Sequence, residues 1–337
     1  MGLSGNGNGN GPPAVLAVDA GNSKTDVAVV GADGRVLSSV RGGGFQPPTV
    51  GAPRAVAGLA ALVDEALRQA GTDRVGHLSA CLANADLPVE EERLTELLTA
   101  RGRSDTVTVA NDTFALLRAG LPDDGPHTGV AVVCGAGINC SGLGPGGRTA
   151  RFPAIGRISG DWGGGGHLAE EALWWAARAD DGRGVPSALA DRLPAHFGLP
   201  SMPRLIEALH LKEVPAERRH ELVPVLFAVA AEGDAVARAL VARQAEEIVV
   251  MATVALRRLD LLAEPVPVVL GGGVLAARHP VLHEAVVALL AERAPKAVPR
   301  VVGAPPVLGA ALLALDTTAA PASAYARLRA HYATAGP

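Results

Sequence analysis

Residues 14–30 place an apolar strand, a tight turn and a second apolar strand in succession, and polar side chains gather at the turn. Asp19 closes the first strand. The turn consists of Gly21, Asn22, Ser23, Lys24 and Thr25. Successive backbone N–H groups in such a turn bind anions, while lysine and hydroxyl side chains add charge and donors. Asp19 could hold the water shell of a Mg²⁺ ion that accompanies phosphate groups. The pattern indicates a phosphate site, although an ordinary hairpin with a polar tip is equally compatible with it.

A second candidate is the pair Asn111-Asp112, which directly follows the apolar segment 106–110. If that segment is a short buried strand, Asp112 lies at its end, where a carboxylate can accept a proton from a substrate hydroxyl group. Aspartate is also common as the N-cap of a helix, and we predict a helix over 113–119. One carboxylate can perform both roles, and we favour catalysis for Asp112.

Two further glycine-rich turns follow predicted strands in the second half of the chain. The earlier one is the turn Gly135-Ala136-Gly137-Ile138-Asn139, and the later one consists of Gly271, Gly272 and Gly273. The earlier turn repeats the strand–turn–strand pattern of residues 14–30 and predicts a second phosphate-binding turn. The later turn lies where a strand passes into a helix, which is where α/β sheets place their ligands. We predict an adenine or ribose contact there, with a merely flexible turn as the alternative.

The elements that must position these residues occur in the same order in both halves. In the first half, the patterns predict two strands within 14–30, a strand at 35–40, an irregular stretch at 42–53, a helix at 56–70, a strand at 76–83, a helix at 88–101, a strand at 106–110 and a helix at 113–119. In the second half, they predict strands at 129–134, 140–143 and 149–152, a long helical section at about 168–262, a strand at 267–270, a helix at 280–291, a strand at 300–302 and a helix at 307–315.

This order is βββαβαβα twice, with an enlarged helical section in the second copy. It predicts an α/β fold of two similar domains with a nucleotide cleft between them, into which the glycine turns of both domains face. We place the first domain at 14–125 and the second at 126–317. Residues 1–13, rich in Gly and Asn, are expected to form a disordered tail.

Composition narrows the class of protein. The 337 residues are 48% hydrophobic and 19% charged, and the formal net charge of −4 argues against a nucleic-acid or anionic-membrane partner. Three cysteines without a C-x-x-C pair suggest a reducing cytosol and no structural zinc. No apolar run approaches ~18 residues, and the first residues lack the basic start and apolar core of a signal peptide. These features together predict a cytoplasmic protein without a membrane span.

Taken together, the motifs resemble the N-acetylglucosamine kinase group of the BadF/BadG/BcrA/BcrD ATPase family, within the acetate and sugar kinase/heat-shock/actin superfamily. The resemblance spans about residues 15–315. It is carried by Asp19-x-Gly21-x-x-Lys24-Thr25-Asp26, Asn111-Asp112, Gly135-Ala-Gly-Ile-Asn139, Gly160-Asp161 and Gly271-Gly-Gly273. No single motif is very specific, but their order and spacing together are.

The resemblance implies an actin-like ATPase fold and an ATP-dependent kinase that uses Mg²⁺. The implied acceptor is a hydroxyl, the 6-hydroxyl, of an N-acetylhexosamine such as N-acetylglucosamine. The first and third motifs would hold ATP phosphates, Asp112 would be the catalytic base, and Gly271–Gly273 would lie near adenosine. It further implies a homodimer, and a C-terminal helix at 322–334 that returns to the first domain.

The sequence departs from the family pattern at the third motif, at the fourth motif and at one expected sugar-binding Asn. Ala136 and Ile138 replace a usual Thr and Ser, Asp161 is followed by Trp-Gly-Gly instead of Glu-Gly-Ser, and Gln46 stands where an Asn is expected. The identity of the sugar is therefore less constrained than the reaction. The residues predicted to contact it are Gln46, Asn84, Asn111, Asp112, Asn139 and Asp161.

Two other functions are compatible with this scaffold. One is an ATP-driven activator of 2-hydroxyacyl-CoA dehydratases, which would need cysteines to hold an iron–sulfur cluster; Cys134 and Cys140 flank a phosphate turn and are poorly placed for that. The other is a non-catalytic sugar sensor. Regulators of that kind usually add a DNA-binding domain, which the short Gly/Asn segment at 1–13 cannot form.

Overall fold

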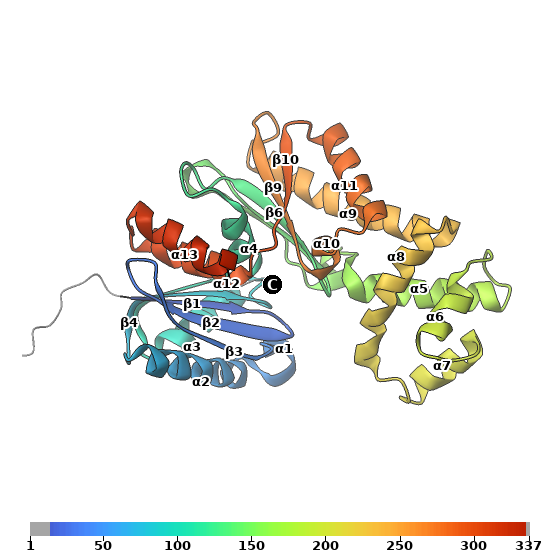
Figure 1. Cartoon of the computed structure of the whole chain (residues 1–337), viewed down its shortest axis with the longest axis horizontal. Helices are drawn as coiled ribbons and strands as arrows, with labels where there is room; N and C mark the ends of the chain where they lie inside the picture. The colour runs from blue at the N-terminus through green and yellow to red at the C-terminus, as the bar shows by residue number, and fades with distance from the viewer. Residues whose placement is uncertain (1–13, 335–337) are drawn as a thin grey trace, which may run out of the picture. The chain divides into compact units, whose positions relative to one another are not determined.

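The computed structural model describes residues 14–334, which divide into two compact units (Figure 1). One unit joins the residues up to Ala119 with those from Ala304 onward, and the other is Gly120–Gly303. This division differs from the boundaries predicted from the sequence, because α12 (Pro306–Thr317) packs on β1 and β4 of the first unit. The predicted tail at 1–13 lies outside the described residues. Within 14–334, no helix is both long enough and apolar enough to cross a membrane.

The first unit contains a five-stranded sheet in the order β3-β2-β1-β4-β5. Its strands are β1 (Val15–Ala20), β2 (Lys24–Val30), β3 (Val36–Gly43), β4 (Val75–Leu82) and β5 (Ser104–Asn111). The first three strands pair antiparallel, and β4 and β5 join parallel to β1. Side chains alternate between the two faces of each strand, so Leu16 and Val18 enter one core and Val15 and Ala17 enter another.

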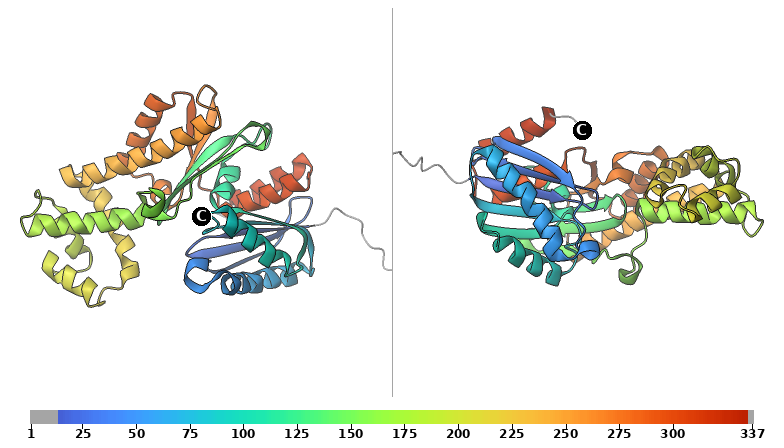
Figure 2. Two further views of the ribbon diagram at one scale, coloured as in Figure 1. Left: turned by 180° about the vertical axis from the view of Figure 1, so that it is seen from behind. Right: turned by 90° about the horizontal axis from the view of Figure 1, so that it is seen from below.

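Helices cover both faces of this sheet, which explains why its central strands are apolar throughout (Figure 2). On one face lie α2 (Ala52–Ala70) and α3 (Pro88–Thr99), whose leucine and valine side chains pack against Leu16 and Val18. The other face is covered by α4 (Thr113–Gly120), α12 and the C-terminal helix α13 (Ala322–Thr334). The helix predicted at 322–334 therefore lies in the first unit.

The second unit repeats the same strand plan. Its sheet has the order β10-β9-β6-β7-β8, formed by β6 (Gly129–Cys134), β7 (Ile138–Leu143), β8 (Thr149–Arg151), β9 (Val266–Gly271) and β10 (Ala297–Val301). Again three consecutive strands pair antiparallel and two more add in parallel. The predicted duplication is therefore confirmed at the level of strand order and direction.

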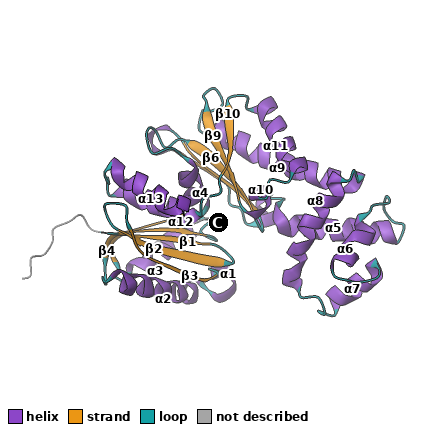
Figure 3. Cartoon of the chain, viewed as in Figure 1, coloured by secondary structure: helices purple, strands orange, loops and turns teal. Residues whose placement is uncertain are grey.

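The predicted helical section between β8 and β9 consists of several separate helices (Figure 3). These are α5 (Gly164–Asp180), α6 (Leu189–His196), α7 (Met202–His210), α8 (Leu222–Ala231) and α9 (Ala235–Arg258), with short 3₁₀ turns at Gly156–Ser159 and Ala216–Glu221. After β9 follow α10 (Gly273–Ala276) and α11 (Pro280–Arg293). The long α9 and α11 pack against each other, and α9 also contacts β6 and β7.

Three local predictions were wrong. The stretch 42–53 is not wholly irregular, because β3 runs on to Gly43 and α1 (Pro47–Val50) starts with prolines, which suit the first turn of a helix. β5 is not a buried strand; it lies at the sheet edge, and only its end residues Ser104 and Asn111 are buried. The turn after β6 is shorter than predicted, because Ile138 and Asn139 already belong to β7.

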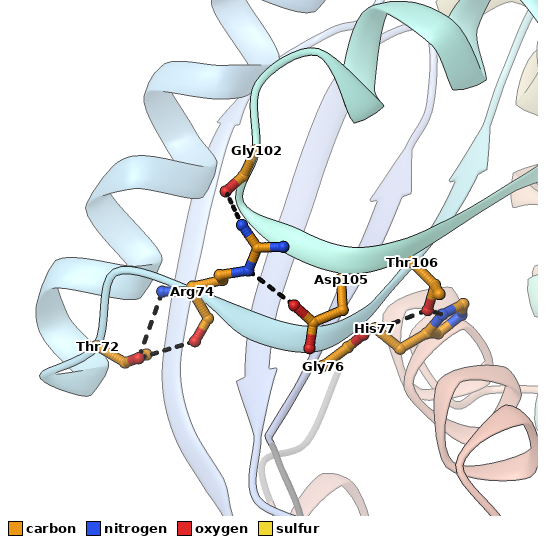
Figure 4. Close-up of polar contacts among 7 residues, drawn as sticks. All are labelled: Thr72, Arg74, Gly76, His77, Gly102, Asp105 and Thr106. Carbon is orange, nitrogen blue, oxygen red and sulfur yellow. Dashed lines mark hydrogen bonds and ion pairs between the residues drawn. The ribbon is translucent and has the colours of Figure 1, made fainter.

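A polar cluster fixes the N-terminal ends of β4 and β5 (Figure 4). Arg74 Nε donates to Asp105 Oδ1 at 2.8 Å, and its Nη1 donates to the Gly102 carbonyl at 3.2 Å. One step into the strands, the Nδ1 atom of buried His77 lies 2.8 Å from the Thr106 hydroxyl. These contacts lie at the opposite end of the sheet from Asp19 and Asp112. Substitutions among them therefore provide controls for substitutions near Asp19 and Asp112.

Candidate active site

The β1–β2 turn is shaped by strand pairing. Ala20 pairs with Thr25, and the Gly21 N–H donates to the Lys24 carbonyl at 2.8 Å, which closes the turn. Asn22 and Ser23 at its tip are exposed, and half of the Lys24 side chain is exposed. The turn predicted to bind phosphate is thus a short, exposed connection between two buried strands.

Carboxylates gather behind this turn. Asp19 and Asp26 are register partners on β1 and β2, so their side chains lie on the same face of the sheet, and both are buried. Burial raises the pKa of Asp19 to about 7, and the negative charges of Asp112 and Asp26 add to this effect, whereas Lys24 opposes it. Burial likewise raises the pKa of Asp112 to about 6. The structure therefore brings the predicted magnesium residue and the predicted base into one acidic group.

This acidic group fits Mg²⁺. Its carboxylates repel one another, and a hard divalent cation would relieve that repulsion through the oxygen ligands it prefers. Among residues 14–334 there is no group of three or more His, Cys, Asp or Glu side chains that could enclose a metal. Magnesium commonly binds in such settings through one or two carboxylates, water and substrate phosphates, and Asp19 could serve as that carboxylate.

Asn111 holds the start of α4. Its Oδ1 atom accepts hydrogen bonds from the Thr113 N–H at 3.0 Å and the Thr113 hydroxyl at 2.6 Å, and its Nδ2 donates to Asp86 at 2.8 Å. The Thr113 N–H also faces Asp112 and lowers the pKa of that carboxyl, but burial outweighs it. Capping of the helix, considered above for Asp112, is therefore shared with its neighbour Asn111.

Two predicted sugar contacts, Gln46 and Asn84, converge on the tip of the β1–β2 turn. Gln46 Nε2 donates to the Asn22 carbonyl at 2.9 Å, and Asn84 Nδ2 donates to the Asn22 side-chain oxygen at 2.9 Å and to the Phe45 carbonyl at 3.1 Å. Gly44 permits this arrangement, because a Cβ atom there would stand 2.0 Å from the Asn22 carbonyl oxygen. The segment carrying Gln46 is thus packed directly onto the β1–β2 turn.

In the second unit, three glycine segments pack backbone to backbone. They are Gly135–Gly137, which connects β6 and β7, Gly163–Gly166 at the start of α5, and Gly271–Gly273 at the end of β9. The Gly165 N–H donates to the Gly135 carbonyl at 2.7 Å, and the Gly166 N–H donates to the Ala136 carbonyl at 2.9 Å. The β6–β7 turn is therefore held from outside, while Ala136 and Gly137 stay exposed.

The other two predicted residues of this unit lie beside these segments. Asn139 lies in β7, and its Oδ1 accepts the N–H of the next residue, Cys140, at 2.7 Å. Asp161 follows the 3₁₀ turn at Gly156–Ser159 and accepts a hydrogen bond from the Ser159 hydroxyl. Its neighbour Trp162 is buried and lies under the Arg243 guanidinium, 3.9 Å from the ring centroid.

The sequence patterns did not predict the residues of α9 that contact this region. Gln244 is fully buried, and its Oε1 accepts the Gly164 N–H at 2.8 Å, which anchors the glycine segment before α5. Burial raises the pKa of Glu247, one turn further on, and the charges of Glu246 and Asp161 add to this effect, whereas Arg243 opposes it. A signal for Gln244 was present, because it occupies a core-facing position among Val241, Ala245 and Ile248 of an apolar helix stripe.

The duplicated sheets, each with three antiparallel strands followed by two parallel ones, define the α/β fold of actin-like ATPases. Residues 16–314 match the BadF/BadG/BcrA/BcrD ATPase family, and the chain belongs to that family.

Similar proteins include two named kinases. An N-acetylmuramic acid/N-acetylglucosamine kinase of Clostridium acetobutylicum is 25% identical over 263 residues, which cover 77% of this chain and 85% of that protein. An N-acetyl-D-glucosamine kinase of Dictyostelium discoideum is 26% identical over 317 residues, which cover 90% of this chain and 98% of that protein. A solved Chromobacterium violaceum structure, provisionally named an N-acetylglucosamine kinase, has a TM-score of 0.67 and 22% identity, covering 90% of this chain and 99% of that one.

Proposed function

We propose that the protein is an ATP-dependent carbohydrate kinase that phosphorylates the 6-hydroxyl of an N-acetylhexosamine, with N-acetylglucosamine as the first candidate. The observation that carries the proposal is Asp112, a largely buried carboxylate at the end of β5 whose pKa of about 6 suits a general base near neutral pH. The names of the similar proteins support the choice of substrate class.

In the proposed reaction, Asp112 accepts the proton of the sugar hydroxyl while the oxygen of that hydroxyl forms a bond to the γ-phosphorus of ATP. The bond between that phosphorus and the bridging oxygen breaks, and its electron pair leaves with ADP. Backbone N–H groups of the β1–β2 and β6–β7 turns, with Lys24, would bind the phosphates, and Gly271–Gly273 would lie near adenosine. Mg²⁺ held through water at Asp19 would neutralise part of the phosphate charge.

The side chains proposed for the sugar favour a neutral substrate. Gln46 and Asn84 are amides, which both donate and accept hydrogen bonds, as a hydroxyl or acetamido group requires. Asp161 is a carboxylate that accepts from sugar hydroxyls and would repel an acidic sugar. Asn111 and Asn139, whose side-chain oxygens accept backbone N–H groups, would be further sugar contacts.

The cysteines weigh against the dehydratase-activator alternative. Cys81, Cys134 and Cys140 are all buried, and burial raises the pKa of Cys134 to about 12 and those of Cys81 and Cys140 further. Cluster ligation requires thiolates, which such surroundings disfavour.

The test measures ADP release with a panel of N-acetylated, free amino and neutral hexoses, together with the variant Asp161→Ala. We expect turnover with an N-acetylhexosamine, and a loss of about 10-fold or more in kcat/KM for the sugar in the variant with ATP affinity nearly unchanged. Absence of sugar-dependent ADP release across the panel would refute the kinase proposal. Equal losses for sugar and ATP would remove Asp161 from the sugar pocket.

A further inference from the structure

We propose that Arg41 is a positioning residue that releases Lys24 for ATP by holding their shared partner, Asp26. The inference rests on the role of Lys24 as a phosphate ligand in the proposed function. It concerns a residue of β3 that none of the family motifs includes.

The geometry gives Arg41 the better hold on Asp26. Arg41 and Asp26 are register partners on β3 and β2, so they lie side by side on one face of the sheet. Arg41 Nε lies 2.6 Å from Asp26 Oδ1 and its Nη2 lies 3.2 Å from Oδ2, which makes the contact bidentate. Lys24 Nζ reaches only Oδ2, at 3.3 Å.

Asp26 is buried, so its carboxylate needs a cationic partner whether Arg41 or Lys24 supplies it. The side chain of Asp26 is only 7% exposed, and a buried charge that loses its sole partner is strongly destabilised. With Arg41 in place, Lys24 can turn toward a phosphate while Asp26 keeps a bidentate cation. Without Arg41, moving Lys24 would strand the carboxylate, so Lys24 would be retained by Asp26.

Two further groups lie near Asp26, and neither can replace this cation. Asp19, its register partner on β1, is itself an acid, and the charge of Asp26 raises the pKa of Asp19. Tyr332 of α13 lies near enough for the Asp26 charge to affect it, and burial followed by that charge raises the pKa of the phenol to about 12. The phenol is therefore neutral at physiological pH. Arg41 also suits a permanent anchoring role because its planar guanidinium stays charged and fits a carboxylate, whereas Lys24 is a flexible point charge.

The experiment measures the dissociation constant of ATP with Mg²⁺, without sugar, for Lys24→Met, Arg41→Met and the double variant. We expect a loss of ATP affinity of about 10-fold or more for Lys24→Met, because this change removes a charge-assisted contact with phosphate. For Arg41→Met we expect a loss of ~3- to 10-fold, because Lys24 would then be retained by Asp26. The double variant should bind ATP like Lys24→Met alone, because Arg41 acts only through Lys24. Arg41→Lys should restore part of the loss, and Arg74→Met provides a control for the lost surface charge.

Each outcome has a distinct meaning. Unchanged ATP affinity in Arg41→Met, or an additive further loss in the double variant, would overturn the inference while leaving the phosphate role of Lys24 intact. Unchanged affinity in Lys24→Met would refute that phosphate role, and with it the inference. Because the Arg41 side chain is 65% exposed, its replacement is compatible with folding, which thermal unfolding of each variant would verify.

Discussion

Asp112→Asn is expected to abolish most turnover while making the folded protein more stable at alkaline pH. The variant keeps the shape of the side chain and an oxygen that can accept from the Thr113 N–H, but it has no charge to bury and no basic carboxylate. Since general-base catalysis is lost, kcat should fall by ~10²-fold or more with ATP affinity retained.

The gain in stability follows from the raised pKa. Burial shifts the pKa of Asp112 from its ordinary value of 3.8 to about 6. At about 1.4 kcal/mol for each pH unit, the ionised carboxylate costs the fold roughly 3 kcal/mol. The side chain retains some exposure, so we expect about 1–3 kcal/mol of added unfolding free energy in the variant.

The sign of the pH dependence is fixed by the same shift. The native state holds the proton more tightly than the unfolded state, so the cost is present in full above pH 6 and disappears below the unfolded value of 3.8. The advantage of Asp112→Asn should therefore be largest at pH 8 and should fall to about a third of that value at pH 4.5. In the wild type, kcat/KM should decline as the pH falls through about 6, because the base becomes protonated.

The assay combines urea unfolding at pH 8, 6 and 4.5 with ADP release and calorimetric ATP binding. Asp105→Asn serves as the control, because that carboxylate is exposed and its loss should change stability by less than about 1 kcal/mol at every pH. A kcat close to that of the wild type would move the base elsewhere, with Asp161 the next candidate. A variant less stable than the wild type at pH 8 would refute the electrostatic reasoning.

Two pairs of variants test the packing that supports the site, both by urea unfolding. Gly164→Ala should cost ~3 kcal/mol or more, because its φ is +83° and a Cβ atom would stand 2.4 Å from the facing turn. Gly58→Ala, at an exposed position of helix α2, should gain about 0.5–1 kcal/mol. Equal effects of the two substitutions would contradict the close approach at Gly164. Arg118→Met should cost about 3–5 kcal/mol, because this fully buried guanidinium holds Asp316 at 2.8 and 3.1 Å. Arg74→Met removes an exposed ion pair and should cost less than ~1 kcal/mol, and a similar loss in both variants would refute the distinction.

Much of the fold was predictable because its local signals agree with its global arrangement. The central strands are apolar on both faces, and glycines or polar residues mark nearly every turn, so the order of strands could be inferred without knowledge of their partners. The burial of β5 could not be inferred in this way. An edge strand and a central strand can share the same composition, and only the pairing of β5 with β4 alone shows that its other side is open.

In the candidate site, too, features with a local sequence signal were predictable and features set by strand register or distant contacts were not. The nearness of Asp19 and Asp112 was predictable, because Asp19 lies near the end of β1 and Asp112 directly follows β5. Parallel strands bring their carboxyl ends to the same edge of a sheet. The pairing of Asp26 with Arg41 depends on the register between β2 and β3, which a one-residue shift would abolish. The attachment of Gln46 and Asn84 to Asn22 joins segments that are 24 and 62 residues apart, and no local pattern predicts such contacts.

The glycine segments of the second unit show that a glycine can be required for packing alone. A Cβ atom on Gly272 would stand 2.5 Å from the Cys134 backbone, and one on Gly164 would meet the backbone of Gly137. These glycines are required for packing whatever the protein binds. By contrast, a Cβ atom on Gly273 or Gly137 would meet nothing within 4 Å. A loss of nucleotide binding after substitution of Gly272 would therefore not identify a contact, because the fold alone explains it. The same loss at Gly273, where the protein itself leaves room for a side chain, would have to come from the nucleotide.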